Sequence, residues 1–210
     1  SYQETAYAVM SRFLTDFTQE ELIRAIRTAH IHGRKLYLTV NTLLKNREIR
    51  EKLFDSLKPL YEAGLDAVIV QDLGVFQFIR RNFPDMHIHA STQMAVTGPE
   101  GMKFLEEQGA ARVVAARELS LEELAAMHKK SSIEIEAFVH GALCYSLSGQ
   151  CLMSSILGGR SGNRGRCAQP CRLPYQVRKG EDRKFPKTED LCPLSLEDIC
   201  TLDILPEIVE

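Results

Sequence analysis

The sequence lacks any apolar run long enough to cross a membrane, and it lacks a strong excess of either charge. No stretch of 18 apolar residues occurs in the 210 residues, so we expect no transmembrane helix and no membrane partner. The net charge is −2, so overall charge does not argue for a nucleic-acid partner. The first residues, SYQETAYAVMSRF, do not have the layout of a secretory signal peptide, and we therefore expect a cytoplasmic protein.

Several catalytic and binding motifs are missing as well. Neither Gly-x-Ser-x-Gly nor His-Glu-x-x-His occurs, which weighs against the common serine and zinc hydrolases. A glycine-rich phosphate turn after an early strand is also missing, which disfavours an open doubly wound sheet.

The sequence does contain a regular alternation of short apolar strands and amphipathic helices. Strands are predicted at 35–40, 67–70, 86–90, 112–115 and 133–139, and helices at 15–33, 47–63, 73–82, 99–108 and 120–130. This pattern predicts an α/β fold with a parallel sheet, and its even spacing favours a TIM-like (β/α) barrel. Only five strands are visible, so we expect an incomplete barrel in a piece of a longer protein. Residues 1–140 would supply the βα units and residues 141–210 a cysteine-rich region leading into a further helix.

Polar residues follow the predicted strands. In a (β/α) barrel the carboxyl ends of the strands carry the chemistry. The residues expected to point towards that mouth are therefore Asn41, Gln71, Asp72, Gln93, Arg117, Glu118 and His140. Of these, Asn41, Gln93, Arg117 and His140 are the candidates for lining the pocket.

The segment 141–175 is a long, glycine-rich loop with no regular apolar period. It holds Cys144, Cys151, Cys167 and Cys171, and two more cysteines follow at Cys192 and Cys200. The spacing is not that of a zinc finger, whereas an iron–sulfur cluster accepts irregular spacing. Two other interpretations stay open. Some cysteines could be buried structural residues, and Cys144, four residues after His140, could be a nucleophile with that histidine as its base.

Basic residues are concentrated in and after this loop. Arg160, Asn163, Arg164 and Arg166 alternate with glycine and serine, an arrangement suited to phosphate contact because the backbone can approach closely. The alternative is a solvated surface. The basic run continues at Arg172, Arg178, Lys179, Arg183, Lys184 and Lys187.

Residues 136–175 resemble the signature of peptidase family U32, the collagenase-like proteins. The resemblance rests on EAFVHGALCYSLSGQCLMSS and GGRSGNRGRCAQPCRLPY, with LTVNTLL, STQMAVT and LSLEDICTLDILPEI as further matches. It implies a TIM-like barrel. It also implies either a protease or an oxygen-independent hydroxylase acting on a ribosomal RNA cytidine, a tRNA wobble uridine or the ubiquinone ring.

For the hydroxylating branches, the resemblance implies a 4Fe-4S cluster held by four cysteines, with prephenate as the hydroxyl source of the RNA-modifying members. By position, Cys144, Cys151 and Cys167 match three ligands and Cys200 the fourth, with Cys192 as second choice and Cys171 as a spare. Arg160, Arg164 and Arg166 would hold RNA backbone or the carboxylates of the prephenate-like donor.

We therefore expect iron–sulfur-dependent hydroxylation of rRNA or tRNA. A U32-type peptidase acting on a peptide substrate is one alternative, and a cluster-bearing RNA-binding subunit without catalysis is another.

Overall fold

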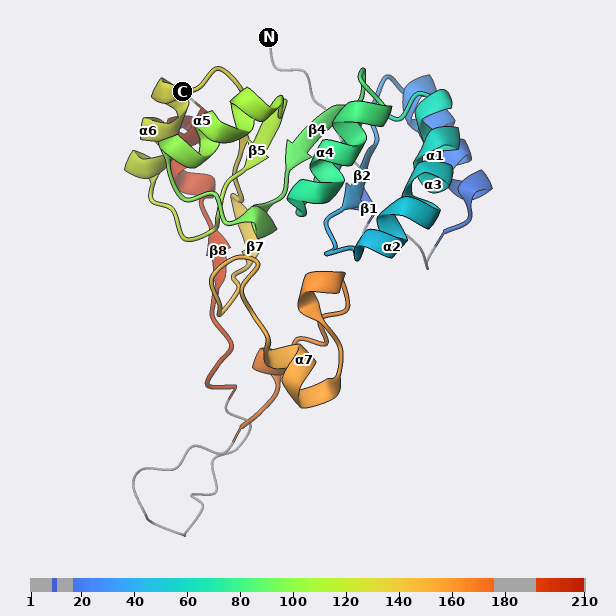
Figure 1. The fold of residues 1–210 in the computed structure, drawn as a ribbon. Helices are drawn as coiled ribbons and strands as arrows, with labels where there is room; N and C mark the ends of the chain where they lie inside the picture. Colours follow the sequence, from blue (N-terminus) through green and yellow to red (C-terminus); the bar gives the residue numbers. More distant parts are fainter. Residues whose placement is uncertain (1–8, 11–16, 176–191, 210) are drawn as a thin grey trace.

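The computed structural model describes residues 9–10, 17–175 and 192–209 (Figure 1). Its main body is a six-stranded sheet in which neighbouring strands are parallel and consecutive in the chain. The strands are β1 (Val9–Met10), β2 (Tyr37–Val40), β3 (Ala67–Val70), β4 (His87–Ala90), β5 (Arg112–Val114) and β6 (Glu134–Glu136). The predicted α/β fold with a parallel sheet is confirmed. The count of five strands was one short, because the two-residue β1 is too brief to give a sequence pattern.

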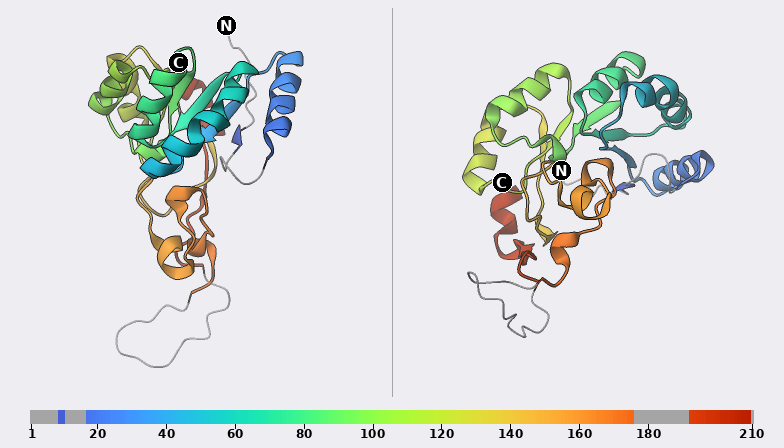
Figure 2. Two further views of the ribbon diagram at one scale, coloured as in Figure 1. Left: turned by 45° about the vertical axis from the view of Figure 1, so that its right-hand side comes forward. Right: turned by 60° about the horizontal axis from the view of Figure 1, so that its bottom comes forward.

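The helices lie along the outer side of the sheet and form an arc around it (Figure 2). They are α1 (Gln19–Ile31), α2 (Asn46–Glu48), the π-helical turn η1 (Ile49–Leu53), α3 (Phe54–Glu62), α4 (Leu73–Asn82), α5 (Pro99–Gln108) and α6 (Leu121–Lys130). Alternate strand residues such as Leu38, Val68 and Ile88 pack with these helices in one core. Tyr37, Ala67 and Ile69 form a separate buried cluster. Burial on both faces explains why the strands read as continuous apolar runs.

Capping boxes mark the starts of two helices, α1 at Gln19 rather than at the predicted residue 15, and α6 at Leu121. The Thr18 hydroxyl accepts a hydrogen bond from the Glu21 backbone N–H, and the Glu21 carboxylate accepts one from the Thr18 N–H. Ser120 and Glu123 repeat this arrangement at α6. Each box satisfies backbone donors that a helix N-terminus otherwise leaves unpaired.

The single helix predicted at 47–63 is instead divided into α2, η1 and α3. Pro59 lies inside α3 and has no N–H to donate to the carbonyl of Asp55. The Gln19 side-chain amide donates to that carbonyl oxygen at 3.2 Å. A residue of α1 therefore supplies the hydrogen bond that the proline removes.

After β6 the chain leaves the sheet, and the strand predicted at 133–139 ends early. A two-stranded antiparallel ribbon follows, formed by β7 (His140–Ala142) and β8 (Asp198–Cys200). The segment predicted to lack secondary structure contains α7 (Met153–Gly158) and the 3-10 turns Gly162–Arg164 and Pro170–Arg172. We call residues 141–175 and 192–200 the cysteine module. The 3-10 turn Leu202–Ile204 and α8 (Leu205–Val209) follow it.

The cysteine module lies below the sheet, at the edge where the parallel strands end (Figure 1). Among the described residues, none of the helices combines the length and apolar character needed to cross a bilayer.

Candidate functional site

One anchor of the cysteine module is a buried serine. Ser148 is 2% exposed, and both its backbone N–H and its hydroxyl donate to the Glu118 carboxylate, the hydroxyl at 3.2 Å. The Thr92 hydroxyl, which follows β4, donates to the Ala115 carbonyl at 3.1 Å and lies 3.5 Å from the Ser148 hydroxyl oxygen. These contacts fix the loop before Cys151 to the carboxyl ends of β4 and β5.

Gly149 brings the same loop against the backbone of the sheet edge. Its φ of +74° lies in the region that favours glycine, and a Cβ there would overlap the carbonyl oxygen of Gln93. Only a glycine fits here, and Cys151 follows two residues later. The backbone geometry therefore explains why a glycine occupies the second position of the Ser-Gly-Gln-Cys sequence.

A second anchor joins the module to α2. The Arg164 guanidinium donates to Glu48 at 2.6 and 3.3 Å and to the Leu43 carbonyl at 3.0 Å. The Leu43 N–H in turn donates to the Asn163 carbonyl at 3.0 Å. The hydrogen bonds from Arg164 and from the Lys45 backbone lower the pKa of Glu48 to about 2. A charged fork therefore holds residues 160–166, the arginine-rich turn, to α2 and to the loop before it.

Arg172 closes the module by joining its two chain segments. Its guanidinium donates to the Ser195 hydroxyl at 2.6 Å and to the carbonyls of Leu196 and Leu143 at 2.7 Å. The planar, multi-donor guanidinium makes this arrangement possible, since a lysine ammonium cannot present donors in that fork. The segment that carries Cys192 is thereby tied to the segment that carries Cys144.

All six cysteines are free thiols, and Cys144, Cys167 and Cys200 are exposed. Burial raises the pKa of the Cys171 thiol; Arg172 opposes this, and the neighbouring Cys167 and Cys144 raise the pKa further. Cys171, which was predicted not to be a cluster ligand, thus lies near two of the predicted ligands.

The surroundings of Gly162 and the register of the β7–β8 ribbon show where Cys151, Cys167 and Cys200 lie. A Cβ added to Gly162 would lie 3.6 Å from the Cys167 Cβ and 4.0 Å from the Cys151 carbonyl oxygen, so Cys151 and Cys167 flank this glycine. Cys200 pairs with His140 across the β7–β8 ribbon. Within the described ranges, no three His, Cys, Asp or Glu side chains converge closely enough to hold a metal ion. The structure thus gathers the cysteines in one module without a closed ligand shell.

The four residues predicted to line one pocket occupy different surroundings. Arg117 lies over the Phe138 ring, 4.2 Å from its centroid, and lines a cavity of about 220 Å³ with Leu143, Ile199 and Thr201. That cavity is not lined by the other three. His140 is exposed on β7, and Asn41 is half-buried after β2.

Gln93 belongs to a pair of buried amides at the sheet edge. Its Oε1 and that of Gln71, which follows β3, are buried and have no hydrogen-bond partner among the described residues. Buried acceptors without partners are unusual and call for a ligand or water. Gln71 was predicted to point towards the mouth but was not among the four residues predicted to line the pocket.

The predicted phosphate-binding residues are divided between two roles. Arg160 and Arg166 are exposed, whereas Arg164 is engaged by Glu48 and Asn163 by Leu43. The basic residues Arg178, Lys179, Arg183, Lys184 and Lys187 lie outside the described residues. The contacts that anchor the module, from Glu118 and Arg172, link residues about 30 positions apart and have no sequence signal of their own.

Comparison with known proteins identifies the family. The profile of peptidase family U32 matches residues 6–210, nearly the whole sequence. The chain belongs to peptidase family U32. The solved structure of the U32 peptidase Mk0906 has a similar fold, with a TM-score of 0.52 at 17% identity over 66% of this chain and 62% of that one.

Two curated proteins from Escherichia coli K12 are similar to this chain. The 23S rRNA 5-hydroxycytidine C2501 synthase is 39% identical over 85% of this chain and 26% of its own length. The tRNA hydroxylation protein P is 40% identical over 80% of this chain and 37% of its own length. The chain therefore spans well under half the length of these relatives.

Proposed function

We propose that this U32 chain belongs to an enzyme that hydroxylates a base of rRNA or tRNA. The observation that carries the proposal is the 39–40% identity to relatives named for rRNA and tRNA hydroxylation. The position of the cysteine module supports it. We infer that the curved parallel sheet is an arc of a (β/α) barrel, whose reactive side is the carboxyl edge of the strands. The module is anchored there by Ser148 and Gly149.

The donor chemistry of the module fits a 4Fe-4S cluster. Thiolates are the ligands such clusters take, and all six thiols are free. Cys144, Cys151 and Cys167 would hold it, with Cys200 as the fourth ligand. When bound, the cluster would supply one-electron redox chemistry. Cys171 lies near Cys144 and Cys167, so the assignment needs a test that separates Cys171 from Cys200.

The groups proposed to bind the substrate are buried acceptors without a hydrogen-bond partner among the described residues, and exposed arginines. The buried amide oxygens of Gln71 and Gln93 could accept hydrogen bonds from a base amine or imide at the sheet edge. Arg160 and Arg166, both exposed, would hold RNA phosphates or the carboxylates of a prephenate-like hydroxyl donor. Arg164, already paired with Glu48, would position this arginine-rich turn.

The first experiment is an iron and acid-labile sulfide determination on protein purified without oxygen. We expect about four of each per chain. The variants Cys144→Ser and Cys200→Ser should lose the cluster and its visible absorption, whereas Cys171→Ser should keep both. Zinc or no metal in the wild-type chain would remove the cluster from the proposal. Loss in Cys171→Ser with retention in Cys200→Ser would instead exchange these two residues in the ligand set.

A peptidase is the second candidate, and one strand register favours it. His140 and Cys200 are directly opposite residues of the antiparallel β7–β8 ribbon, and directly opposite residues in such a ribbon carry their side chains on the same face. A cysteine nucleophile needs a base at that position. Under this alternative, hydrolysis of gelatin peptides should be lost in both His140→Ala and Cys200→Ala. Peptide hydrolysis that persists in both variants would contradict it.

A further inference from the structure

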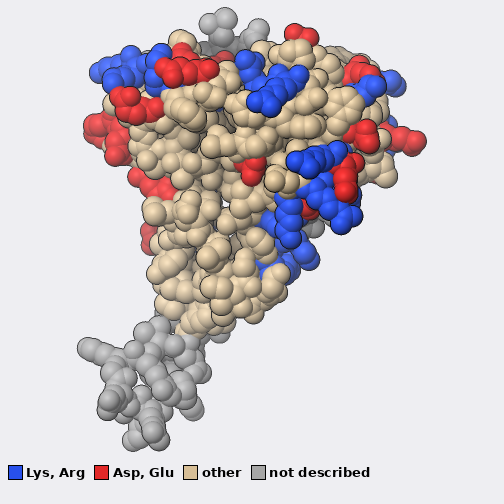
Figure 3. Space-filling view, in the orientation of Figure 1, with Lys and Arg blue, Asp and Glu red and all other residues tan. Residues whose placement is uncertain are grey.

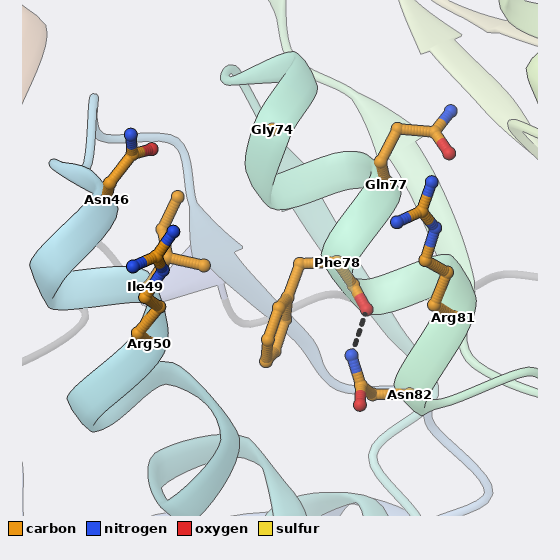
Figure 4. Close-up of a pocket in the computed structure, with 8 residues that line it drawn as sticks. All are labelled: Asn46, Ile49, Arg50, Gly74, Gln77, Phe78, Arg81 and Asn82. Atoms are coloured by element: carbon orange, nitrogen blue, oxygen red, sulfur yellow. Dashed lines mark hydrogen bonds between the residues drawn. The ribbon is translucent and has the colours of Figure 1, made fainter.

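A second concave surface lies on the flank of the molecule, between η1 and α4 (Figure 4). This hollow of about 320 Å³ is lined by Asn46, Ile49, Arg50, Gly74, Gln77, Phe78, Arg81 and Asn82. We call it the basic groove. Its residues come from α2, η1 and α4 in the helix layer, and none of them is a cysteine or one of the residues predicted to line the barrel mouth.

The charge of the basic groove is positive and unbalanced. Arg50 and Arg81 are exposed, and in the described part of the chain neither makes an ion pair. The two acids of the adjoining helical turns are already engaged. Glu48 binds Arg164, and Glu51 binds Arg47 at 2.9 Å. A polyanion would therefore meet two free guanidinium groups and neutralised carboxylates.

The groove also offers an aromatic and apolar floor. The half-buried Phe78 ring projects from α4 toward η1, and Ile49 lies across from it (Figure 4). The η1 turn is π-helical, a geometry that is rare and frequently found at functional sites. Guanidinium groups beside a partly accessible ring form the combination that binds single-stranded nucleic acid, with phosphates on arginine and a base stacked on the ring.

The basic groove adjoins the cysteine module rather than standing alone. Glu48, two residues before Arg50, holds Arg164 of the arginine-rich turn. Lys and Arg side chains gather along this flank and continue down onto the module (Figure 3). The exposed Arg160 and Arg166 belong to that part of the chain. A strand leaving the carboxyl edge could therefore follow one surface from the module to the groove.

We infer that the basic groove binds a single-stranded segment of the RNA substrate, flanking the base that reaches the carboxyl edge. This inference rests on the proposed function for the identity of the RNA, and it adds a binding surface outside the reactive site. Arg50 and Arg81 contact two phosphates, and Phe78 stacks on a base between them.

The test is a binding titration of fluorescein-labelled single-stranded RNA from 50 to 200 mM salt, using the whole chain. The double variant Arg50→Gln/Arg81→Gln should weaken binding about tenfold at 100 mM salt. It should also reduce the slope of log K against log salt by about 1.4, since each lost single-strand phosphate contact accounts for about 0.7. The control Arg27→Gln/Lys129→Gln removes the same charge from exposed positions on α1 and α6 and should change affinity less than twofold.

Three outcomes overturn the inference. They are equal affinities of the two double variants, an unchanged salt slope in the groove variant, and competition by poly-glutamate as strong as that by RNA of equal charge. The last result would assign the groove to an acidic protein segment. Iron content is measured on the same samples and should be equal in all of them. A chain without iron whose RNA binding still depends on Arg50 and Arg81 would reject the proposed cluster and keep the groove.

Discussion

Gly149 lies against the backbone carbonyl of Gln93 so closely that no side chain fits between them. This contact joins a loop of the cysteine module to the turn that follows β4. The neighbouring Ser148 is buried and bound by Glu118. Two adjacent residues of the loop therefore determine where Cys151 lies relative to the carboxyl edge of the sheet.

We predict that Gly149→Ala displaces the module without unfolding the sheet. The positive φ alone costs a non-glycine residue about 1 kcal/mol, and overlap with the Gln93 carbonyl adds to that cost. Hydrogen exchange over residues 144–152 should rise, while far-UV circular dichroism changes little. Gly158→Ala is the matched control, since a Cβ there meets nothing within 4 Å. Equal exchange in both variants would show that the contact does not hold the loop.

The sequence was sufficient to predict the elements whose signals are local. Strands such as Ala67–Val70 are buried on both faces and read as unbroken apolar runs, and Thr18 and Ser120 mark their helices by capping boxes. The two-residue β1 gives no such signal. The π turn at Ile49–Leu53 interrupts a regular helical period that had predicted one helix.

The candidate site was predictable in its residue types and less so in its geometry. The cysteines were recognised because four of them are clustered in one loop. Their anchoring depends on pairs such as Arg164–Glu48, which are 116 residues apart in the chain. Nothing in the local pattern around Arg164 distinguishes a guanidinium that binds phosphate from one that binds a carboxylate. Long-range pairing therefore limited the prediction of individual roles.

The Arg164–Glu48 pair predicts that attachment of the module weakens at acidic pH. The pKa of Glu48 is about 2 in the folded chain, below its usual 4.5. Its contribution is therefore present above about pH 4.5 and is lost as the pH falls toward 2. Hydrogen exchange over residues 160–166 should rise in that window for the wild-type chain. In Glu48→Gln, exchange should already be faster at pH 6 and should depend less on pH.

The control for this prediction is Glu100→Gln, which removes an exposed ion pair with Lys130 between α5 and α6. Exchange of residues 160–166 in this variant should follow the wild type at every pH. A wild-type curve without any change between pH 4.5 and 2, or a Glu48→Gln curve that matches it, would contradict the role of the pair.

Arg172 provides a prediction about the far end of the module. Arg172→Lys keeps the charge but loses the fork that reaches Leu143, Ser195 and Leu196. Each lost charged hydrogen bond contributes about 1.5–3 kcal/mol, so the residues between Cys192 and Leu196 should separate from Leu143. The labelling rate of Cys192 by a maleimide should rise severalfold. Arg166→Lys, at an exposed position, should leave that rate unchanged. A similar rise in both variants would show that any arginine-to-lysine change in the module exposes Cys192, and that the hydrogen bonds of Arg172 are not the cause.

His89 is a buried imidazole on β4, 4% exposed, whose ring meets Tyr37 edge-on at 4.7 Å. Burial, followed by the charge of Arg112, lowers its pKa to about 4. His87 and Lys35 add to this lowering, whereas Glu134 opposes it. The folded chain therefore holds the neutral ring at pH values where the unfolded chain would protonate it.

The resulting prediction is a loss of stability in mild acid. Because the folded pKa is below the usual 6.5, the free energy of unfolding should fall as the pH drops from about 6.5 to about 4, by up to ~3 kcal/mol. Urea unfolding at several pH values measures this. His89→Gln, which has no proton to gain, should flatten the curve over that interval, whereas His128→Gln, at an exposed position of α6, should not. A His89→Gln curve with the wild-type slope would assign the acid sensitivity to other groups and leave the buried imidazole without a part in it.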